Sequence, residues 1–142
     1  MIKAIPIEIL IAEDDHLITT LQKKQIGKLV KTPIKTFWNG KELMNYIHAA
    51  IEEVESLLIL LDINMPVMDG WEVLEKINLH YAQKEIFIVM LTSSVYPEDK
   101  KRAFTYPQVI SFNDKFLEPE DFSAIINYKS LNKIIELNKL SD

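Results

Sequence analysis

Short apolar runs alternate with amphipathic segments along the whole chain. Five of the runs predict β-strands, at residues 7–12, 33–38, 57–62, 86–91 and 109–113. The segments between and after them repeat their apolar residues at helical spacing and predict helices at about residues 16–30, 40–54, 70–81 and 97–106, and from about 119 onward. Strands that alternate with helices in this way are typical of an α/β protein with a parallel sheet and helices on both faces.

The first two predicted helices carry specific expectations about capping and burial. Asp15 is placed to cap the first helix, which should bury Ile18, Leu21 and Leu29. In the second helix the apolar stripe continues as far as Val54. We therefore expect both helices to pack on the sheet through these residues.

The apolar run at residues 57–61 is the most informative stretch, because it leads directly into Asp62. Five consecutive apolar residues suit a strand that is covered on both faces. Pro66 and the pair Asp69-Gly70 then supply turn chemistry. Asp62 should emerge at the carboxyl end of its strand, where open α/β sheets bind their ligands.

The composition limits the class of protein. A chain of 142 residues, 48% hydrophobic and 26% charged, is expected to form one soluble domain with its own core. The absence of cysteine excludes disulfides and thiolate metal sites. No apolar run approaches the roughly 20 residues of a membrane span, and the first residues do not resemble a signal peptide. From these two observations we expect a cytoplasmic protein without a membrane partner. The net charge of −5 argues against nucleic acid as a partner, because phosphate binding needs a basic face.

Several polar residues follow different strands of the predicted sheet. Glu13 and Asp14 end the first strand, Asp62 ends the third, Thr92 ends the fourth and Lys115 follows the fifth. In a parallel sheet these ends share one edge, so the three carboxylates should lie together. Oxygen ligands without cysteine or histidine suit a hard cation such as Mg²⁺. With a lysine and a hydroxyl beside them, they predict a site that accepts a phosphoryl group on a carboxylate.

Four pieces of sequence resemble the response regulator receiver domain of two-component signalling, in the order in which that family has them. They are ILIAEDD at residues 9–15, LDINMPVMDG at residues 61–70, LTS at residues 91–93 and DK at residues 114–115. The second piece is highly specific. The resemblance implies a doubly wound, flavodoxin-like fold with five parallel strands in the order 2-1-3-4-5. The match covers about residues 7–128. We expect a single receiver domain over residues 1–142, with this core and a C-terminal helical extension at about 130–140.

The resemblance assigns the phosphoryl group to Asp62. It assigns the Mg²⁺ cofactor to Glu13, Asp14, Asp62 and the backbone carbonyl of Asn64. Asp15 remains a helix cap rather than a metal ligand.

The resemblance also implies which residues respond to the phosphoryl group. Thr92 would be the switch hydroxyl, Lys115 would contact the phosphoryl group, and Phe112 would be the switch aromatic. Phe112 can equally be plain core. Asn64 and Ser94 would flank the path of the water that removes the phosphoryl group, and so would tune dephosphorylation.

The implied function is that of a stand-alone receiver rather than a metabolic enzyme. A histidine kinase or phosphotransfer protein would donate the phosphoryl group, and the output would pass to an unknown partner protein. Homodimer formation remains open. One alternative is a small phosphatase of the haloacid dehalogenase type, which would want an acid where Asn64 stands. Another is a degenerate receiver that acts as a constitutive interaction module.

Two further expectations concern the C-terminal third of the chain. The family usually places a proline after its lysine, with a cis bond between them, whereas Phe116 follows Lys115 here. Because a cis bond before a non-proline residue costs roughly 2.5–4 kcal/mol, we predict a trans bond. Leu131, Ile134 and Ile135 have helical spacing, so the segment from Ser130 should pack on the protein rather than form a free tail.

Overall fold

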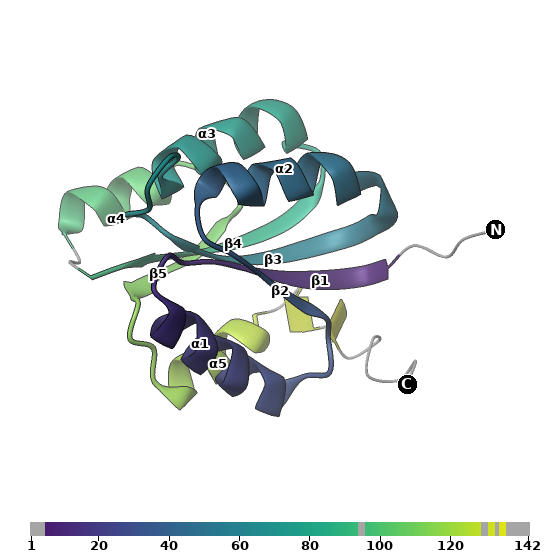
Figure 1. Ribbon diagram of the computed structural model, residues 1–142, viewed down its shortest axis with the longest axis vertical. Helices are drawn as coiled ribbons and strands as arrows, with labels where there is room; N and C mark the ends of the chain where they lie inside the picture. Colours follow the sequence, from purple (N-terminus) through teal and green to yellow (C-terminus); the bar gives the residue numbers. More distant parts are fainter. Residues whose placement is uncertain (1–4, 94–95, 129–130, 133, 136–142) are drawn as a thin grey trace.

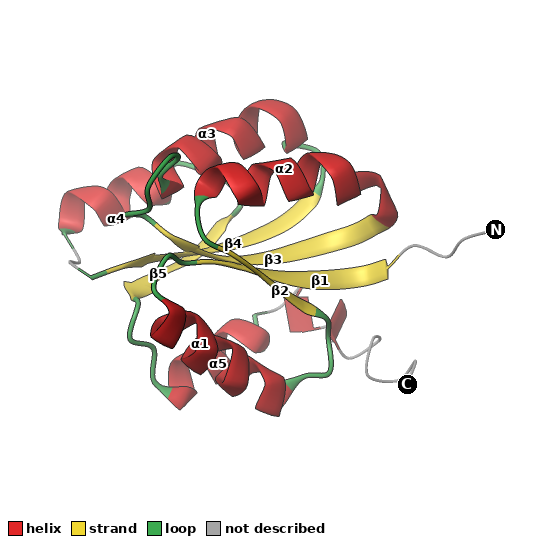
Figure 2. Cartoon of the chain, viewed as in Figure 1, coloured by secondary structure: helices red, strands yellow, loops and turns green. Residues whose placement is uncertain are grey.

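Five parallel strands form one sheet in the order β2-β1-β3-β4-β5 (Figures 1 and 2). The computed structural model describes residues 5–93, 96–128, 131–132 and 134–135. The strands are β1 (Ile5–Ala12), β2 (Ile34–Phe37), β3 (Val54–Asp62), β4 (Glu85–Thr92) and β5 (Val109–Asp114). The helices are α1 (His16–Leu29), α2 (Gly40–Ala50), the short 3₁₀ helix η1 (Ile51–Glu53), α3 (Gly70–Tyr81), α4 (Pro97–Ala103) and α5 (Pro119–Ile126). This topology confirms the doubly wound fold and the strand order expected from the sequence.

The helices form two layers around the sheet. Helices α2, α3 and α4 cover one face, and α1 and α5 cover the other (Figure 1). Side chains of β3 alternate between the two cores: Leu57, Ile59 and Leu61 pack under the first layer, and Leu58 and Leu60 under the second. The apolar run at residues 57–61 is therefore unbroken because both faces of β3 are buried.

The strand register brings the carboxyl ends of the strands to one edge of the sheet. The residue pairs nearest this edge are Ala12 with Leu61, Asp62 with Leu91, and Thr92 with Asp114. The residues that directly follow these strand ends therefore lie close together, as the sequence predicted.

Helix α1 differs from the prediction in the residues that it buries. Asp15 caps it as expected, since its Oδ1 accepts the backbone N–H groups of Leu17 and Ile18. However, the prediction that Leu21 is buried was wrong: 49% of its surface is exposed, while the polar Gln22 is 2% exposed. The inner face of the helix follows the spacing i, i+4, i+8 through Ile18, Gln22 and Ile26, which turns Leu21 outward.

The ends of helices α2 and α4 depend on the residues that follow them. The predicted second helix was too long, because α2 ends at Ala50 and η1 follows it. Val54 is the first residue of β3 and pairs with Ile5 of β1. Pro97 occupies the first turn of α4, as expected, and this helix ends before Pro107.

The segment after α5 packs against the second core. Leu131 and Ile135 are helical, and both are buried in that core. The expectation that this segment is not a free tail is therefore confirmed for the residues described, while residues 136–142 lie outside them. Among the described residues, no helix combines the length and apolar character needed to cross a membrane.

Candidate functional site

Asp62 is the last residue of β3 and is 1% exposed. The chain then turns sharply, held by hydrogen bonds from the N–H of Ile63 to the carbonyl of Leu91 and from the N–H of Gly70 to the carbonyl of Ile63. A Cβ at Gly70 would lie 2.6 Å from the carbonyl oxygen of Asp62, so only glycine allows this approach. The N–H of Asn64 donates to Asp62 Oδ1 at 3.2 Å, which fixes one carboxylate oxygen.

The turn contains a strained residue. Val67 has a φ of 68°, a left-handed conformation that is unusual for a β-branched side chain. The N–H of Met68 donates to the carbonyl of Pro66 at 2.7 Å and closes a γ-turn around Val67. The N–H of Gly40, at the start of α2, donates in turn to the carbonyl of Met68. The loop after Asp62 is thus pinned to the neighbouring helix.

Glu13 lies at the end of β1, where backbone and side-chain bonds hold it. Its N–H donates to the carbonyl of Phe37, and its Oε2 accepts the N–H of Asp15 at 3.0 Å. The hydroxyl of Thr19 donates to its carbonyl oxygen. The Glu13 side chain is 1% exposed, whereas Asp14 next to it is exposed. The two acids therefore approach the site from the interior and from the solvent.

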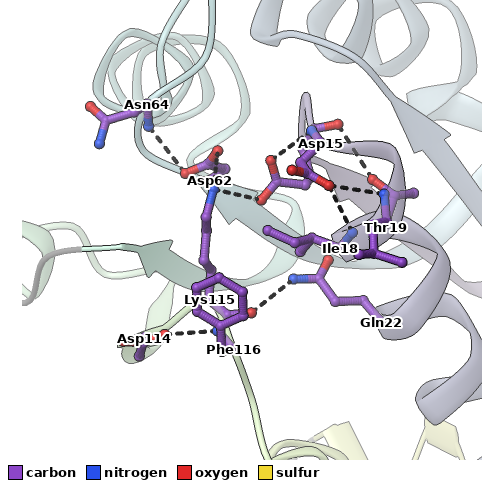
Figure 3. A network of polar contacts seen from close by, with 11 residues as sticks. Asp15, Ile18, Thr19, Gln22, Asp62, Asn64, Asp114, Lys115 and Phe116 are labelled. Carbon is purple, nitrogen blue, oxygen red and sulfur yellow. Dashed lines mark hydrogen bonds and ion pairs between the residues drawn. The ribbon is translucent and has the colours of Figure 1, made fainter.

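The three predicted carboxylates come together with the predicted lysine. Glu13, Asp14 and Asp62 each contribute an oxygen to a group within 4.8 Å of one another. Lys115 Nζ lies 3.4 Å from Glu13 Oε1 and 3.8 Å from Asp62 Oδ2. In Figure 3, the Lys115 side chain extends from the loop after β5 toward Asp62.

The loop after β5 positions this lysine without a proline. The N–H of Lys115 donates to the carbonyl of Thr92. The carbonyl of Lys115 accepts a hydrogen bond from the side-chain amide of Gln22 (Figure 3). The peptide bond between Lys115 and Phe116 is trans, which confirms the prediction. The N–H of Phe116 donates to Asp114 Oδ1 at 2.8 Å. The loop is therefore anchored on both sides of the lysine, which reaches the acidic edge.

Burial and neighbouring charges shift the pKa values of the site. Burial raises the pKa of Glu13 to about 7; the N–H of Asp15 opposes this shift, and the charge of Asp62 adds to it. Burial also raises the pKa of Asp62, against the opposing effect of Lys115. For Lys115, burial acts to lower the pKa, but the carboxylates of Asp62 and Glu13 outweigh it and hold the pKa above its usual value. The site therefore has an excess of buried negative charge.

The oxygens of the site fit a divalent metal ion. Glu13 Oε1 and Asp62 Oδ2 are buried, and neither accepts a hydrogen bond from any described residue. The carboxylates of Glu13, Asp14 and Asp62 form a donor set made only of oxygens, which suits Mg²⁺. A cation here would compensate charge that Lys115 alone leaves in excess.

The other residues predicted for the site are Asn64, Thr92, Phe112 and Ser94. Asn64 is exposed two residues beyond Asp62, and Thr92 is buried at the end of β4. Phe112 is buried beside Met90, its partner in the strand pairing, so it already packs in the first core. Ser94 lies outside the described residues. The roles predicted for these residues remain predictions.

Sequence reasoning missed two residues that support the site from α1. Gln22 holds the carbonyl of Lys115, and Thr19 holds that of Glu13. The available signal was helical spacing from Ile26: Gln22 lies four residues and Thr19 seven residues before it, which places both polar side chains on the buried face of the helix.

Comparisons with known proteins agree with this geometry. The family model for the response regulator receiver domain matches residues 9–127. The chain is 31% identical over 124 residues to a probable methanogenesis regulatory protein, FilR2, of Methanothrix harundinacea, covering 85% of this chain and 79% of that protein. Its fold is similar to that of a two-component response regulator from Cytophaga hutchinsonii, with a TM-score of 0.78 and 24% identity, covering 92% and 99% of the two chains. The fold is also similar to that of a chain in the crystal structure of the CheX-CheY-BeF3-Mg+2 complex from Borrelia burgdorferi, with a TM-score of 0.72 and 23% identity. The match covers 86% of this chain and 87% of that chain. The chain belongs to the family of response regulator receiver domains.

Proposed function

We propose that this receiver accepts a phosphoryl group on Asp62 in a Mg²⁺-dependent reaction. The observation that carries the proposal is the state of the two carboxylate oxygens of Asp62. Oδ1 accepts the N–H of Asn64, whereas Oδ2 has no hydrogen-bond donor among the described residues and lies 3.8 Å from Lys115 Nζ. One oxygen is thus fixed and the other keeps its lone pairs for attack on phosphorus.

The protein's own side chains would position the phosphoryl group and supply charge against it. Asp62 Oδ2 would form the new bond to phosphorus as the bond to the donor breaks. Lys115 would hold the phosphoryl oxygens as a point charge, and the Thr92 hydroxyl would donate to one of them. Glu13, Asp14, Asp62 and the carbonyl of Asn64 would hold Mg²⁺, which supplies positive charge against the transferred group.

The donor is proposed to be a histidine kinase or a phosphotransfer protein. Around the loop after β5, the surface offers exposed apolar side chains close to the site. Leu21 and Phe116, which is 65% exposed, line a hollow of about 190 Å³ between α1 and this loop. A partner seated there would reach Lys115 and Asp62 from the solvent side.

The output is proposed to pass through a protein contact that the phosphoryl group switches. The new group carries roughly −1.5 to −2 charges. Lys115 and Thr92 would follow this charge and bias the packing of β4, β5 and α4 around Phe112. The phosphorylated form would then prefer a different partner from the free form.

Labelling with acetyl phosphate tests the proposal. We expect an acid-labile adduct on the wild type with Mg²⁺, and none with EDTA or in Asp62→Asn. Asp69→Asn is the matched control: it removes a carboxylate from the same loop, and asparagine also caps helices well. Turnover of small phosphate esters without a lasting adduct would support a phosphatase instead, and no reaction would support a constitutive interaction module.

A further inference from the structure

The lysines of this acidic protein are concentrated in one stretch of sequence. Residues 16–41 contain six lysines and no acidic residue, while the rest of the chain contains ten basic and 21 acidic residues. This stretch forms α1, the edge strand β2 and the start of α2. The protein therefore has a cationic region despite its net charge of −5.

Part of this region lines a hollow between α1 and the end of β2. The hollow has a volume of about 500 Å³, within the usual range of small-molecule sites. The lining side chains that can recognise a ligand are His16, Thr20, Lys23 and Lys24 of α1 together with Thr36 and Trp38. His16, Thr20 and Lys23 have the spacing i, i+4, i+7, which places them along one flank of the helix.

The two lysines of the hollow are free to bind an anion. Within the described part of the chain, the ion pairs all belong to Lys115, so Lys23 and Lys24 have no carboxylate partner. The lining contains no acid. The nearby Glu42 accepts the backbone N–H of Trp38 at 3.2 Å but does not line the hollow.

An aromatic surface stands beside these lysines. The rings of His16 and Trp38 lie with their centres 3.7 Å apart, and Trp38 is 41% exposed. An indole with an exposed surface can stack on a planar base. The hydroxyl of Thr36 adds a polar contact at the opposite wall of the hollow.

We propose that the hollow between α1 and β2 binds an aromatic phosphate ester of the nucleotide class, with its base on Trp38 and its phosphates at Lys23 and Lys24. Thr20, whose hydroxyl donates to the carbonyl of His16, and Thr36 line the same hollow and would add polar contacts to the ligand. The hollow adjoins the acidic cluster through Thr19, which lines it and donates to the carbonyl of Glu13, but none of the cluster's carboxylates line it. The proposal does not depend on phosphoryl acceptance at Asp62.

A mononucleotide fits these features better than a longer polyanion. Outside residues 16–41 the protein has more acidic than basic residues, and this negative charge would repel an extended polyphosphate backbone. A single nucleotide would contact only the cationic hollow. Inorganic phosphate would use the lysines but leave the indole uncovered. The combination of ring and charge therefore selects a ligand that carries both.

Tryptophan fluorescence offers a direct test. In a Trp71→Phe background Trp38 is the sole tryptophan. We would titrate ADP, AMP, adenosine, inorganic phosphate and a short single-stranded oligoadenylate into this protein in EDTA, so that no metal bridges a ligand to the acidic cluster. We expect saturable quenching by ADP with a Kd below about 1 mM, and binding of adenosine and of phosphate that is weaker by about tenfold or more.

Charge-reversal variants locate the site. Lys23→Glu/Lys24→Glu should weaken ADP binding by about tenfold or more. The control Lys28→Glu/Lys31→Glu reverses the same charge at exposed lysines outside the hollow and should change it by less than about threefold. Asp62→Asn should bind ADP like the wild type, and Trp38→Leu, followed by calorimetry, should bind it more weakly.

Four results would overturn the inference. They are the absence of saturable quenching by ADP, phosphate binding as tight as that of ADP, tighter binding of the oligonucleotide than of the mononucleotide, and an equal loss of affinity in the control pair. Loss of acetyl phosphate labelling at Asp62 would leave the inference intact.

Discussion

Replacing Glu13 with glutamine should stabilise the metal-free protein at neutral and alkaline pH. The reason is the pKa of the Glu13 carboxyl, which burial raises from 4.5 to about 7 in the folded state. Between those two values the folded protein holds a proton that the unfolded chain has lost. The free energy of unfolding therefore falls as the pH rises through this window, and remains low above pH 7. Glutamine carries no charge and removes this penalty.

The size of the effect follows from the pKa difference. Each unit of pKa corresponds to about 1.4 kcal/mol, so the full shift corresponds to an upper limit of about 3 kcal/mol. The gain of Glu13→Gln over the wild type should be below about 1 kcal/mol at pH 5 and about 3 kcal/mol at pH 8. For a domain of this size, that gain corresponds to a rise in melting temperature of about 10 °C at pH 8.

Calorimetry in EDTA at pH 5 and pH 8 measures this gain. Glu52→Gln is the control, because it removes one carboxylate from an exposed position far from the site and should alter stability by less than about 0.5 kcal/mol. In a second series, added Mg²⁺ should stabilise the wild type at pH 8 more than it stabilises Glu13→Gln, because the variant lacks one proposed metal ligand.

The reasoning fails if Glu13→Gln is no more stable than the wild type at pH 8 without metal. It also fails if the gain is the same at pH 5 and pH 8, because the stabilisation would then have a cause other than ionisation.

Three other substitutions test the loop after β3. Gly70→Ala should destabilise the protein by about 1–3 kcal/mol in urea unfolding, because its Cβ would lie 2.6 Å from a backbone oxygen. The control Gly27→Ala has open space around the new Cβ and should stabilise the protein by about 0.5–1 kcal/mol. Equal effects of the two substitutions would contradict this. Val67→Gly should raise the free energy of unfolding by about 1 kcal/mol by relieving the left-handed backbone, and a loss would show that the side chain matters more. Asn64→Arg should change the lifetime of the phosphoryl group, measured as decay of the labelled protein, and unchanged decay would rule out a role for this position.

Much of the fold could be predicted because each strand and helix has a clear apolar pattern. The run at residues 57–61 required burial on both faces, and Asp62 at its end located the site. The convergence of Glu13, Asp14 and Lys115 on Asp62 then followed from the parallel order of the strands.

Two predictions failed because the polarity pattern of a short segment did not decide its structure. Leu21 looked like core but is exposed, because Gln22 turns inward to bond a backbone carbonyl. Val54 continues the apolar stripe of the second predicted helix in the sequence, but it belongs to β3 because it pairs with Ile5 of β1. Contacts between distant segments decided both cases, and no local pattern reports them.

The most direct measurement of the central claim is the position of the phosphoryl group on the chain. Protein labelled with acetyl phosphate and Mg²⁺ is reduced with borohydride, which converts a phosphorylated aspartate to homoserine, and is then digested and sequenced by mass spectrometry. We expect homoserine at residue 62 alone. Homoserine at Asp14 or Asp15 with Asp62 intact, or an unmodified chain after full exposure to the donor, would contradict the assignment of Asp62 as the phosphoacceptor.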